Sequence, residues 1–437
     1  MPPGVIVRWV KFVKSLTSLG PRYVALWIGH TVSQFGTYVA FLTIPLLVLH
    51  IQNATQTSGT LDFSIAYAAE TAPTLIVGLL GGVLLDRWQL RPVMVATDLI
   101  RASAFFYLAA SVGDLSLFTV FVMALLVGSM TTLFDGALFA LIPSLVPGHR
   151  LVDGNGYVAA SQQANFALGP LAAGLLVVWT GDPALGMFLN GVTFVVSAIM
   201  LKWVGRVDHQ RTPEDERASF LTEAANGIRY IWAEPRLRTT TIAAAVPNFV
   251  IGFVEATFVV LAFDVLGAVD EAQVGVLFFF LGVGGVVGAL LAPRVSRRLG
   301  IGRTLILGIT IAGTLLFAVM FTTFGPIAFV LQAAWMVGIS FMNVALATVR
   351  QHYSVPSMLG RVVTASRALS WALLPVGALL GGWLGNTAES YRWVARAAPL
   401  IIVGVAIWLT TTIVWSNTFG PGFDESDVHL PGETAEA

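Results

Sequence analysis

The chain lacks cysteine entirely. None occurs in its 437 residues, which excludes disulfide bonds, thiolate chemistry and cysteine-ligated zinc. The chain is also poor in charge, because Asp, Glu, Lys and Arg make up 11% of it, whereas soluble globular proteins carry about 25%. The 24 acidic and 24 basic side chains balance, so no charge excess indicates a nucleic-acid partner. Water is therefore not the main solvent of this chain, and we expect no nucleic-acid partner.

Motifs that carry catalysis are missing as well. The sequence contains no Gly-x4-Gly-Lys-Ser/Thr loop, so any use of ATP would require another subunit. It contains no His/Cys metal set, no Gly-x-Ser-x-Gly elbow and no catalytic triad. We therefore expect no enzyme activity, no bound metal and no cofactor.

Long hydrophobic runs are what the chain does have, since 56% of its residues are hydrophobic. A membrane-spanning helix needs about 20 mainly apolar residues. Gly, Pro and charge clusters divide the sequence into twelve runs of this kind, which predicts an all-α polytopic membrane protein. The expected spans are 23–50, 61–85, 92–112, 115–142, 156–179, 184–204, 239–266, 273–293, 304–323, 326–349, 362–384 and 397–415.

The basic residues indicate the orientation of these spans. With the N-terminus inside, only Arg392 and Arg396 of the 24 Lys and Arg fall on the outer side. Because cytoplasmic loops are enriched in Lys and Arg, this asymmetry predicts a multi-pass protein of the cell's inner (plasma) membrane with both termini in the cytoplasm.

The longest polar interval divides the spans six plus six. Within it, "ASFLTEAANGIRYIWAEPRLR" places apolar residues on one helical face, as in an amphipathic interfacial helix. The acidic tail has little that could pack, so we expect it to be disordered. The predicted domains are a cytoplasmic amphipathic N-terminus (1–22), a six-helix bundle (23–204), a cytoplasmic linker (205–238), a second six-helix bundle (239–415) and the tail (416–437).

The two halves repeat each other. "GGVLLDRWQLR" aligns with "VGALLAPRVSRRLG" at an offset of 206, so that Gly82 falls on Gly288. "AASQQANFALGPLAAGL" aligns with "TASRALSWALLPVGALL" at an offset of 205, so that Pro170 falls on Pro375. Each proline removes a backbone donor and is expected to interrupt or bend its helix. Six spans repeated in parallel predict two pseudo-symmetric bundles that rock about a central site.

On these motifs the chain resembles the major facilitator superfamily over residues 20–415. "GVLLDRWQLR" matches the signature between helices 2 and 3 of that family, except that Gln89 replaces a usual glycine. Helix 5 resembles the signature of members that exchange drugs for protons, although Asn165 and Ala173 replace glycines. The run "DLIRA" is similar to the branch that contains macrolide-efflux and enterobactin-export proteins. The matching residues are Gly82, Asp86, Arg87 and Arg91 in the first signature and Gly156, Gly169, Pro170 and Gly174 in the second.

The charges beside helix 2 suggest a conformational latch. Asp86 ends this helix at the inner surface, and a carboxylate is favoured at a helix N-terminus, so we expect it to cap helix 11 in one transport state. Arg87 and Arg91 would complete the latch, or would instead contact lipid phosphates. Asp98 and Arg101 are three residues apart on helix 3 and are expected to pair, either as part of this machinery or as a static ion network.

Three acids are candidates for proton coupling. At about 1.5 Å per residue, Glu70 lies about 24 Å from Asp86, which places it in the outer half of the membrane core, and Glu255 lies equally deep. Neither has a basic partner in its own helix, so each is expected to exchange a proton when its solvation changes, or else to stay protonated against a backbone carbonyl. Asp135 is a second acid for Arg101.

Polar and aromatic residues inside the spans are candidates for lining a substrate cavity, because such groups normally face a cavity or a partner helix. The predicted lining residues are Gln34, Asn165, Asn248, Phe253 and Trp371.

Together, the residues and the resemblance predict a secondary active transporter. It would export an amphipathic or cationic small molecule, driven by the proton gradient, with protons, substrate and the bilayer as partners and the monomer as its state. Two alternatives stay open: an importer or uniporter of nutrients with the same fold, and a receptor that does not transport.

Overall fold

A computed structural model describes residues 14–57, 59–75, 77, 88–205, 220–354 and 359–415. These residues form two compact units. Unit 1 takes the described residues of Met1–Thr57, Ala69–Glu216 and Asp270–Phe279, and unit 2 takes those of Ser58–Ala68, Arg217–Val269 and Phe280–Ala437. Each unit therefore includes a short segment from the other half of the sequence.

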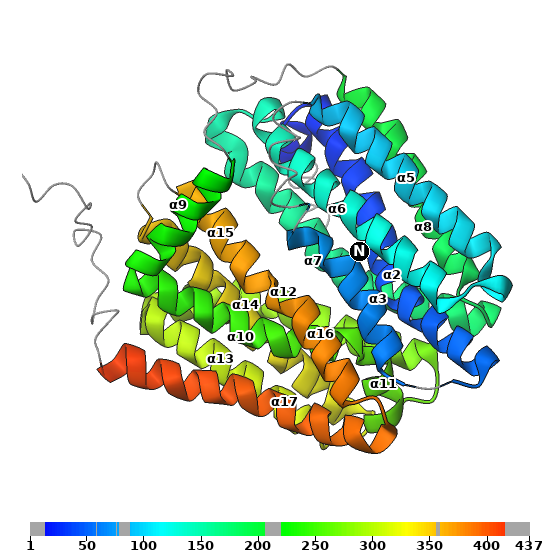
Figure 1. The fold of residues 1–437 in the computed structure, drawn as a ribbon. Coiled ribbons are helices and arrows are strands. Elements are labelled where there is room, and N and C mark those ends of the chain that lie inside the picture. The colour runs from blue at the N-terminus through cyan, green and yellow to red at the C-terminus, as the bar shows by residue number, and fades with distance from the viewer. Residues whose placement is uncertain are drawn as a thin grey trace, which may run out of the picture. The chain divides into compact units, whose positions relative to one another are not determined.

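Unit 1 is built around α2, which packs against α7 and α8, while α5 packs against α6 and α8 (Figure 1). Local chemistry explains where these helices begin and end. Pro21 starts α2, a position where its missing N–H costs nothing, and Gly181 ends α7 with a φ of 76°. The elements of unit 1 are α2 (Pro21–Thr55), α5 (Leu90–Ala110), η1 (Val112–Asp114), α6 (Leu117–Leu145), η2 (Gly148–Arg150), α7 (Leu151–Thr180) and α8 (Ala184–Val204). The helix α3 (Leu61–Thr71) is shared, because its residues up to Ala68 belong to unit 2 and the rest belong to unit 1.

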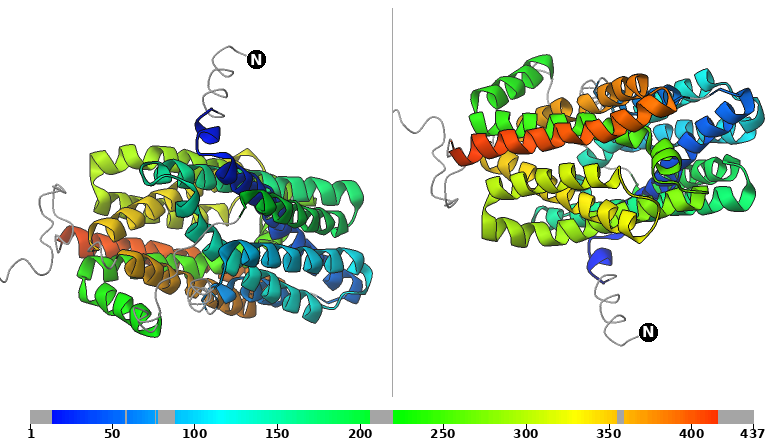
Figure 2. Two further views of the ribbon diagram at one scale, coloured as in Figure 1. Left: turned by 90° about the horizontal axis from the view of Figure 1, so that it is seen from above. Right: turned by 90° about the horizontal axis from the view of Figure 1, so that it is seen from below.

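Unit 2 packs α13 against α14 and α17, and α10 against α16 (Figures 1 and 2). Thr387 caps α17 in a capping box with Ser390, which satisfies free N–H groups at the helix start. The elements are α9 (Phe220–Ala233), α10 (Pro235–Ala256), α11 (Phe258–Val260), η4 (Leu261–Val265), α12 (Glu271–Leu299), α13 (Ile301–Val319), α14 (Pro326–His352), α15 (Leu359–Trp371), α16 (Leu373–Leu384), α17 (Ala388–Leu409) and η5 (Thr410–Trp415).

Eleven helices in the described part of the chain are long and apolar enough to cross a membrane. Of the predicted span 61–85, α3 covers the first residues, and 78–87 lie outside the described residues. The two prolines act differently. The helix is interrupted at Ala372, between α15 and α16 and just before Pro375, although the N–H of Ala372 still donates to the carbonyl of Ala368. By contrast, α7 runs through Pro170 without a break. The prediction of an interruption is confirmed for Pro375, while Pro170 is accommodated within a continuous helix.

The helix predicted in the linker is present as α9, which packs against α15. Its Ile231 is fully buried against α15, whereas Ile228 and Trp232 are exposed. One face of α9 therefore packs into unit 2. The exposed side chains of Ile228 and Trp232 are compatible with the expected position of this helix at the membrane interface.

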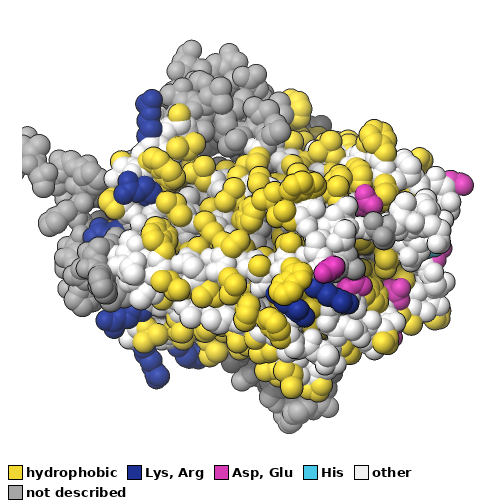
Figure 3. Space-filling view, turned by 60° about the horizontal axis from the view of Figure 1, so that its bottom comes forward, with side chains coloured by type: hydrophobic (Ala, Val, Ile, Leu, Met, Phe, Trp, Pro, Cys, Tyr) yellow, Lys and Arg dark blue, Asp and Glu magenta, His cyan; other side chains and the backbone are white. Residues whose placement is uncertain are grey.

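Exposed hydrophobic side chains are abundant, as expected of a surface in contact with lipid. Trp179 is 80% exposed, Phe118 75% and Val330 65%. Hydrophobic side chains cover most of the face drawn in Figure 3, and acidic side chains gather toward one end of it. This distribution fits a protein whose solvent is mainly hydrocarbon.

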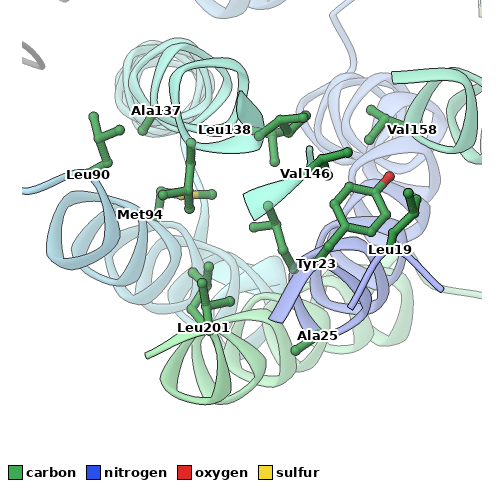
Figure 4. Close-up of a cluster of buried hydrophobic side chains, with 14 of the residues drawn as sticks. Leu19, Tyr23, Ala25, Leu90, Met94, Ala137, Leu138, Val146, Val158 and Leu201 are labelled. Atoms are coloured by element: carbon green, nitrogen blue, oxygen red, sulfur yellow. The ribbon is translucent and has the colours of Figure 1, made fainter. Parts of the chain in front are cut away.

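A cluster of buried apolar side chains joins α2, α5, α6 and α8 of unit 1 (Figure 4). Tyr23, Met94, Leu138 and Leu201 in this cluster are at most 1% exposed. The hydroxyl of Tyr23 also donates to the carbonyl of Gly154 at 2.6 Å, which ties α2 to α7. These contacts pack α2, α5, α6, α7 and α8 closely together at this end of unit 1.

Glycines allow α10 and α16 to touch backbone to backbone in unit 2. A Cβ atom added at Gly377 would overlap the carbonyl oxygen of Phe249, and one at Gly252 would overlap that of Leu374.

We expect Gly377→Val to lower the free energy of unfolding by at least about 1–3 kcal/mol, since the backbone must move to relieve the overlap. Thermal unfolding followed by tryptophan fluorescence in detergent measures this. Gly404→Val is the control, since nothing lies within 4 Å of its Cβ position, and equal stability of the two variants would contradict the prediction.

Candidate functional site

Glu255 is a carboxyl group within a membrane-spanning helix that has a tyrosine as its partner. It lies one residue before the end of α10, and its Oε2 accepts a hydrogen bond of 2.6 Å from the hydroxyl of Tyr67 on α3. The neighbouring Phe253 is 2% exposed and packs against the ring of Tyr391, which holds this end of α10 in place. The two residues come from spans 188 positions apart in sequence but belong to the same unit.

The first residues of α3 are fixed to α16 and the turn that follows it. The hydroxyl of Thr60 donates to the carbonyl of Gly382 at 2.8 Å, and the N–H of Leu61 donates to Oδ1 of Asn386 at 3.2 Å. A Cβ atom at Gly382 would overlap the hydroxyl of Ser64, so only glycine permits this approach. These contacts fix the start of α3 and so set the position of Tyr67, which lies further along the same helix.

Glu70 follows Tyr67 by three residues and therefore lies near the same face of α3. Its backbone carbonyl lies against Gly128 of α6, in unit 1. In the described part of the chain its carboxyl group has no hydrogen-bond or ion-pair partner. The two predicted acids thus differ, because Glu255 is held by a tyrosine and Glu70 is not.

Asp98 and Arg101 form an ion pair, as their spacing predicts. Nη2 of Arg101 lies 2.5 Å from Oδ1 of Asp98, and the two side chains are 3% and 0% exposed. Asp135, on the facing helix α6, interacts electrostatically with Arg101, as expected for a second acid. These charges meet inside the bundle of unit 1, where an isolated charge would be costly.

The proposed latch is described only in part, because Gly82, Asp86 and Arg87 lie outside the described residues. Arg91 is described in the first turn of α5. Its Nε donates to the carbonyl of Leu201 at 2.8 Å, and its Nη2 donates to that of Lys202 at 3.3 Å. A cation at the last carbonyls of α8 complements the helix dipole. Arg91 thus ties α5 to α8, and its part in a latch stays a prediction.

The helix 5 motif contains glycines in opposite environments. A Cβ atom at Gly169 would lie 2.5 Å from Cβ of Tyr38, and one at Gly174 would overlap the carbonyl of Glu271 at the start of α12. Gly156 has nothing within 4 Å of its Cβ position. Pro170 lies within α7, and its carbonyl faces Gly275. The second half of the motif is therefore a packing surface for α2 and α12 within unit 1.

These environments predict unequal effects of one substitution. Gly174→Ala is expected to reduce transport activity and thermal stability, because the added methyl group pushes α12 away from α7. Gly156→Ala is the matched control and should match the parent protein in both. Ligand-dependent uptake into liposomes and thermal unfolding measure the two effects, and an active, stable Gly174→Ala variant would refute the packing role.

The predicted cavity residues fall into two groups. Two amides tie helices together: Asn165 donates to the carbonyl of Thr31 at 2.9 Å, and Asn248 donates to that of Ser370 at 3.0 Å. Phe253 is buried against Gly381 and Tyr391, so in this structure it contacts protein and does not line open space. Gln34 is half-buried, and Trp371 is 43% exposed with the guanidinium of Arg367 at 4.9 Å from its ring centre.

A cavity of about 660 Å³ lies elsewhere, between the ends of α5 and α8 in unit 1. Phe106 and Phe188 line it, together with Thr180 and Asp182, and none of the predicted cavity residues does.

Some residues of the site were not predicted. Tyr67 stands in a run of small residues, "SIAYAAET", where nothing local indicates a partner in α10. Thr131 and Ser197 are ordinary polar residues of apolar helices, and only the packing of α5 against α6 and α8 places them beside Arg101 and Asp98.

Eleven helices of this length and composition in the described part of the chain are those of a multi-pass membrane protein. The sequence model of the Major Facilitator Superfamily matches residues 26–375. The chain belongs to this superfamily, whose members are transporters and not enzymes, and it has the corresponding fold.

Relatives and solved structures agree with this assignment. An uncharacterized MFS-type transporter, y4rN, of Sinorhizobium fredii is 30% identical, over 90% of this chain and 95% of the relative. The multidrug efflux pump Tap of Mycolicibacterium fortuitum is 26% identical (89% and 95%), and macrolide efflux protein A of Streptococcus pyogenes is 22% identical (87% and 93%). A crystal structure of the nucleoside transporter NupG superposes with a TM-score of 0.75 at 11% identity, over 89% of this chain and 99% of that chain.

Proposed function

We propose that this protein is a proton-coupled exporter of amphipathic or cationic small molecules in the plasma membrane, with both termini in the cytoplasm. The observation that carries the proposal is the hydrogen bond from Tyr67 to the carboxyl group of Glu255. An acid inside an apolar helix is expensive to keep, and such acids commonly serve proton or substrate movement. The names of the efflux relatives favour export.

The proposed mechanism uses the two states of this carboxyl group. The ionised group accepts the Tyr67 hydrogen bond and holds α3 against α10. Protonation cancels its charge and weakens the bond, since hydrogen bonds to ionised acceptors are the stronger ones. Proton uptake then favours separation of the two helices, and proton release favours their contact. Glu70, on the same face of α3, is the second acid through which a proton would pass.

We propose that the substrate is bound by predicted cavity residues whose side chains are at least partly exposed. Trp371 offers an exposed aromatic face, and Gln34 a half-buried amide. Aromatic faces bind flat apolar groups and cations. These two residues are the candidates for contact with the substrate.

Purified protein in liposomes with an imposed pH gradient tests the proposal. Internal pH is recorded while macrolides, tetracyclines, lipophilic cations and siderophores are added one at a time. Proton movement that depends on one compound, opposite in direction to that compound, supports the exporter. Substrate flux without proton movement would identify a uniporter, flux in the same direction as protons would identify an importer, and tight binding without flux would identify a receptor. Each of these results would overturn the proposal.

A further inference from the structure

A second polar cluster lies within unit 1. His30 on α2, Asp98 and Arg101 on α5, and Ser197 on α8 are 1%, 0%, 3% and 0% exposed. A Cβ atom at Gly29 would lie 3.4 Å from the backbone of Ser197, so α2 and α8 touch at this level. The cluster is therefore sealed between helices and is not a surface feature.

Aromatic walls surround the ion pair at its centre. The guanidinium carbon of Arg101 lies 4.2 Å from the ring centre of Phe194 and 4.6 Å from that of Phe134. Its Nη2 pairs with Asp98, and its Nη1 donates to the hydroxyl of Thr131 at 3.3 Å. These contacts hold the charge in place, but they use only part of its hydrogen-bonding capacity.

The imidazole of His30 is held by stacking alone. Its ring lies 6.1 Å from that of Phe134, with 14° between the planes, and it feels the charge of Arg101. Within the described ranges of the chain, neither ring nitrogen has a hydrogen-bond partner. A neutral imidazole has one donor and one acceptor, so both remain unmatched.

Buried polar atoms of this cluster lack hydrogen-bond partners among the described residues. Nδ1 and Nε2 of His30 and Nε of Arg101 have none, and Oδ2 of Asp98 has only the hydroxyl of Ser197 beside it. The group includes an obligate donor, an obligate acceptor and atoms that can do either. Water can donate and accept, and buried water usually bridges such groups. A metal ion does not suit a site that contains a guanidinium group.

We propose that this cluster is a hydrated proton-binding site, in which internal water bridges His30 and the oxygen of Asp98 that does not bind Arg101, and exchanges a proton with them. The ionisable groups that face the site are His30 from α2, Asp98 and Arg101 from α5, and Asp135 from α6. From α8 it is faced by the uncharged Ser197 and Phe194. Asp135 supplies a second negative charge near Arg101, which offsets the charge of an added proton.

The site is separate from the one assigned to coupling. Glu255 belongs to unit 2, whereas the cluster belongs to unit 1. Only the use of this proton in transport rests on the proposed function, and its binding does not.

Infrared difference spectra of the purified protein in liposomes, recorded while the pH is stepped, test the proposal without any substrate. We expect a titrating carboxyl band that disappears in Asp98→Asn. A water O–H band should shift in heavy-oxygen water and disappear in His30→Phe, which keeps an aromatic ring but no nitrogen. Glu389→Gln, which removes an exposed carboxyl group on α17, should leave both bands unchanged.

Two results would overturn the proposal. Absence of a band assignable to Asp98 at every pH where the protein stays folded would make the cluster a static ion pair. Absence of the heavy-oxygen shift in the parent protein would make it dry. His30→Phe keeps the test decisive if Asp98→Asn does not fold, because the water band must still be lost. Glu255→Gln should retain both bands, so failure of the coupling proposal is distinguishable from failure of this one.

Discussion

Glu255→Gln is expected to reduce substrate-dependent proton movement to the level of protein-free liposomes, while substrate still moves down its own gradient. The amide keeps the size of the side chain and a neutral oxygen that can accept from Tyr67, so it resembles the protonated acid and both arrangements of α3 and α10 stay accessible. What is lost is the ability to bind and release a proton. The loss is therefore one of coupling and not of folding, and simultaneous recording of internal pH and substrate flux measures it.

Three further variants sharpen this experiment. Tyr67→Phe removes the donor but keeps the acid, and is expected to slow coupled flux without abolishing it. Glu70→Gln asks whether the second acid is also needed. Glu389→Gln removes an exposed carboxyl group of the same unit and should behave as the parent. Full coupling in Glu255→Gln would show that the proton travels elsewhere.

Asp98→Leu is expected to destabilise the protein by about 3–5 kcal/mol, because it leaves the buried charge of Arg101 without its partner. Arg101 is 3% exposed and lies between two aromatic rings, so its guanidinium group is shielded from the bulk water that would otherwise solvate the unpaired charge. The double variant Asp98→Leu/Arg101→Met removes both charges together. It should be clearly more stable than the single variant, since apolar groups of similar volume often replace a buried pair at little cost.

Thermal unfolding in detergent, followed by size-exclusion chromatography, compares these proteins. The interaction energy follows from the cycle of two single variants and the double variant. Arg91→Met serves as a comparison, because Arg91 is bound to carbonyl groups and its loss leaves no charge unpaired. A single variant as stable as the double would mean that Arg101 finds another partner.

Local features of the fold followed from the sequence. Hydrophobic run length predicted the spans, and the amphipathic pattern within the linker predicted α9. The pairing of Asp98 with Arg101 was also predictable, because residues three apart on a helix are neighbours whatever the tertiary structure. The break at Ala372 followed from Pro375, which cannot donate a backbone hydrogen bond.

Features that depend on the packing of distant helices could not be predicted from the sequence. The partner of Glu255 is 188 residues away, and no periodicity in α3 or α10 indicates it. Phe253 was expected at the cavity because it is aromatic, but the close approach of Gly381 buries it. The surroundings of His30 likewise depend on packing, since only the arrangement of α2, α5, α6 and α8 brings Phe134 and Arg101 to it.

The first residues of α3 belong to unit 2, whose other segments come much later in the sequence, and this affects the order in which the protein can fold during synthesis. Thr60 leaves the ribosome early, but the carbonyl that it binds belongs to Gly382, which is synthesised 322 residues later. Since chains fold from the N-terminus as they emerge, the first turns of α3 must wait in the bilayer without their partners. Completion of unit 2 is thus a late step of biogenesis, and a chain truncated before α16 would display an unsatisfied helix to the quality-control machinery of the membrane.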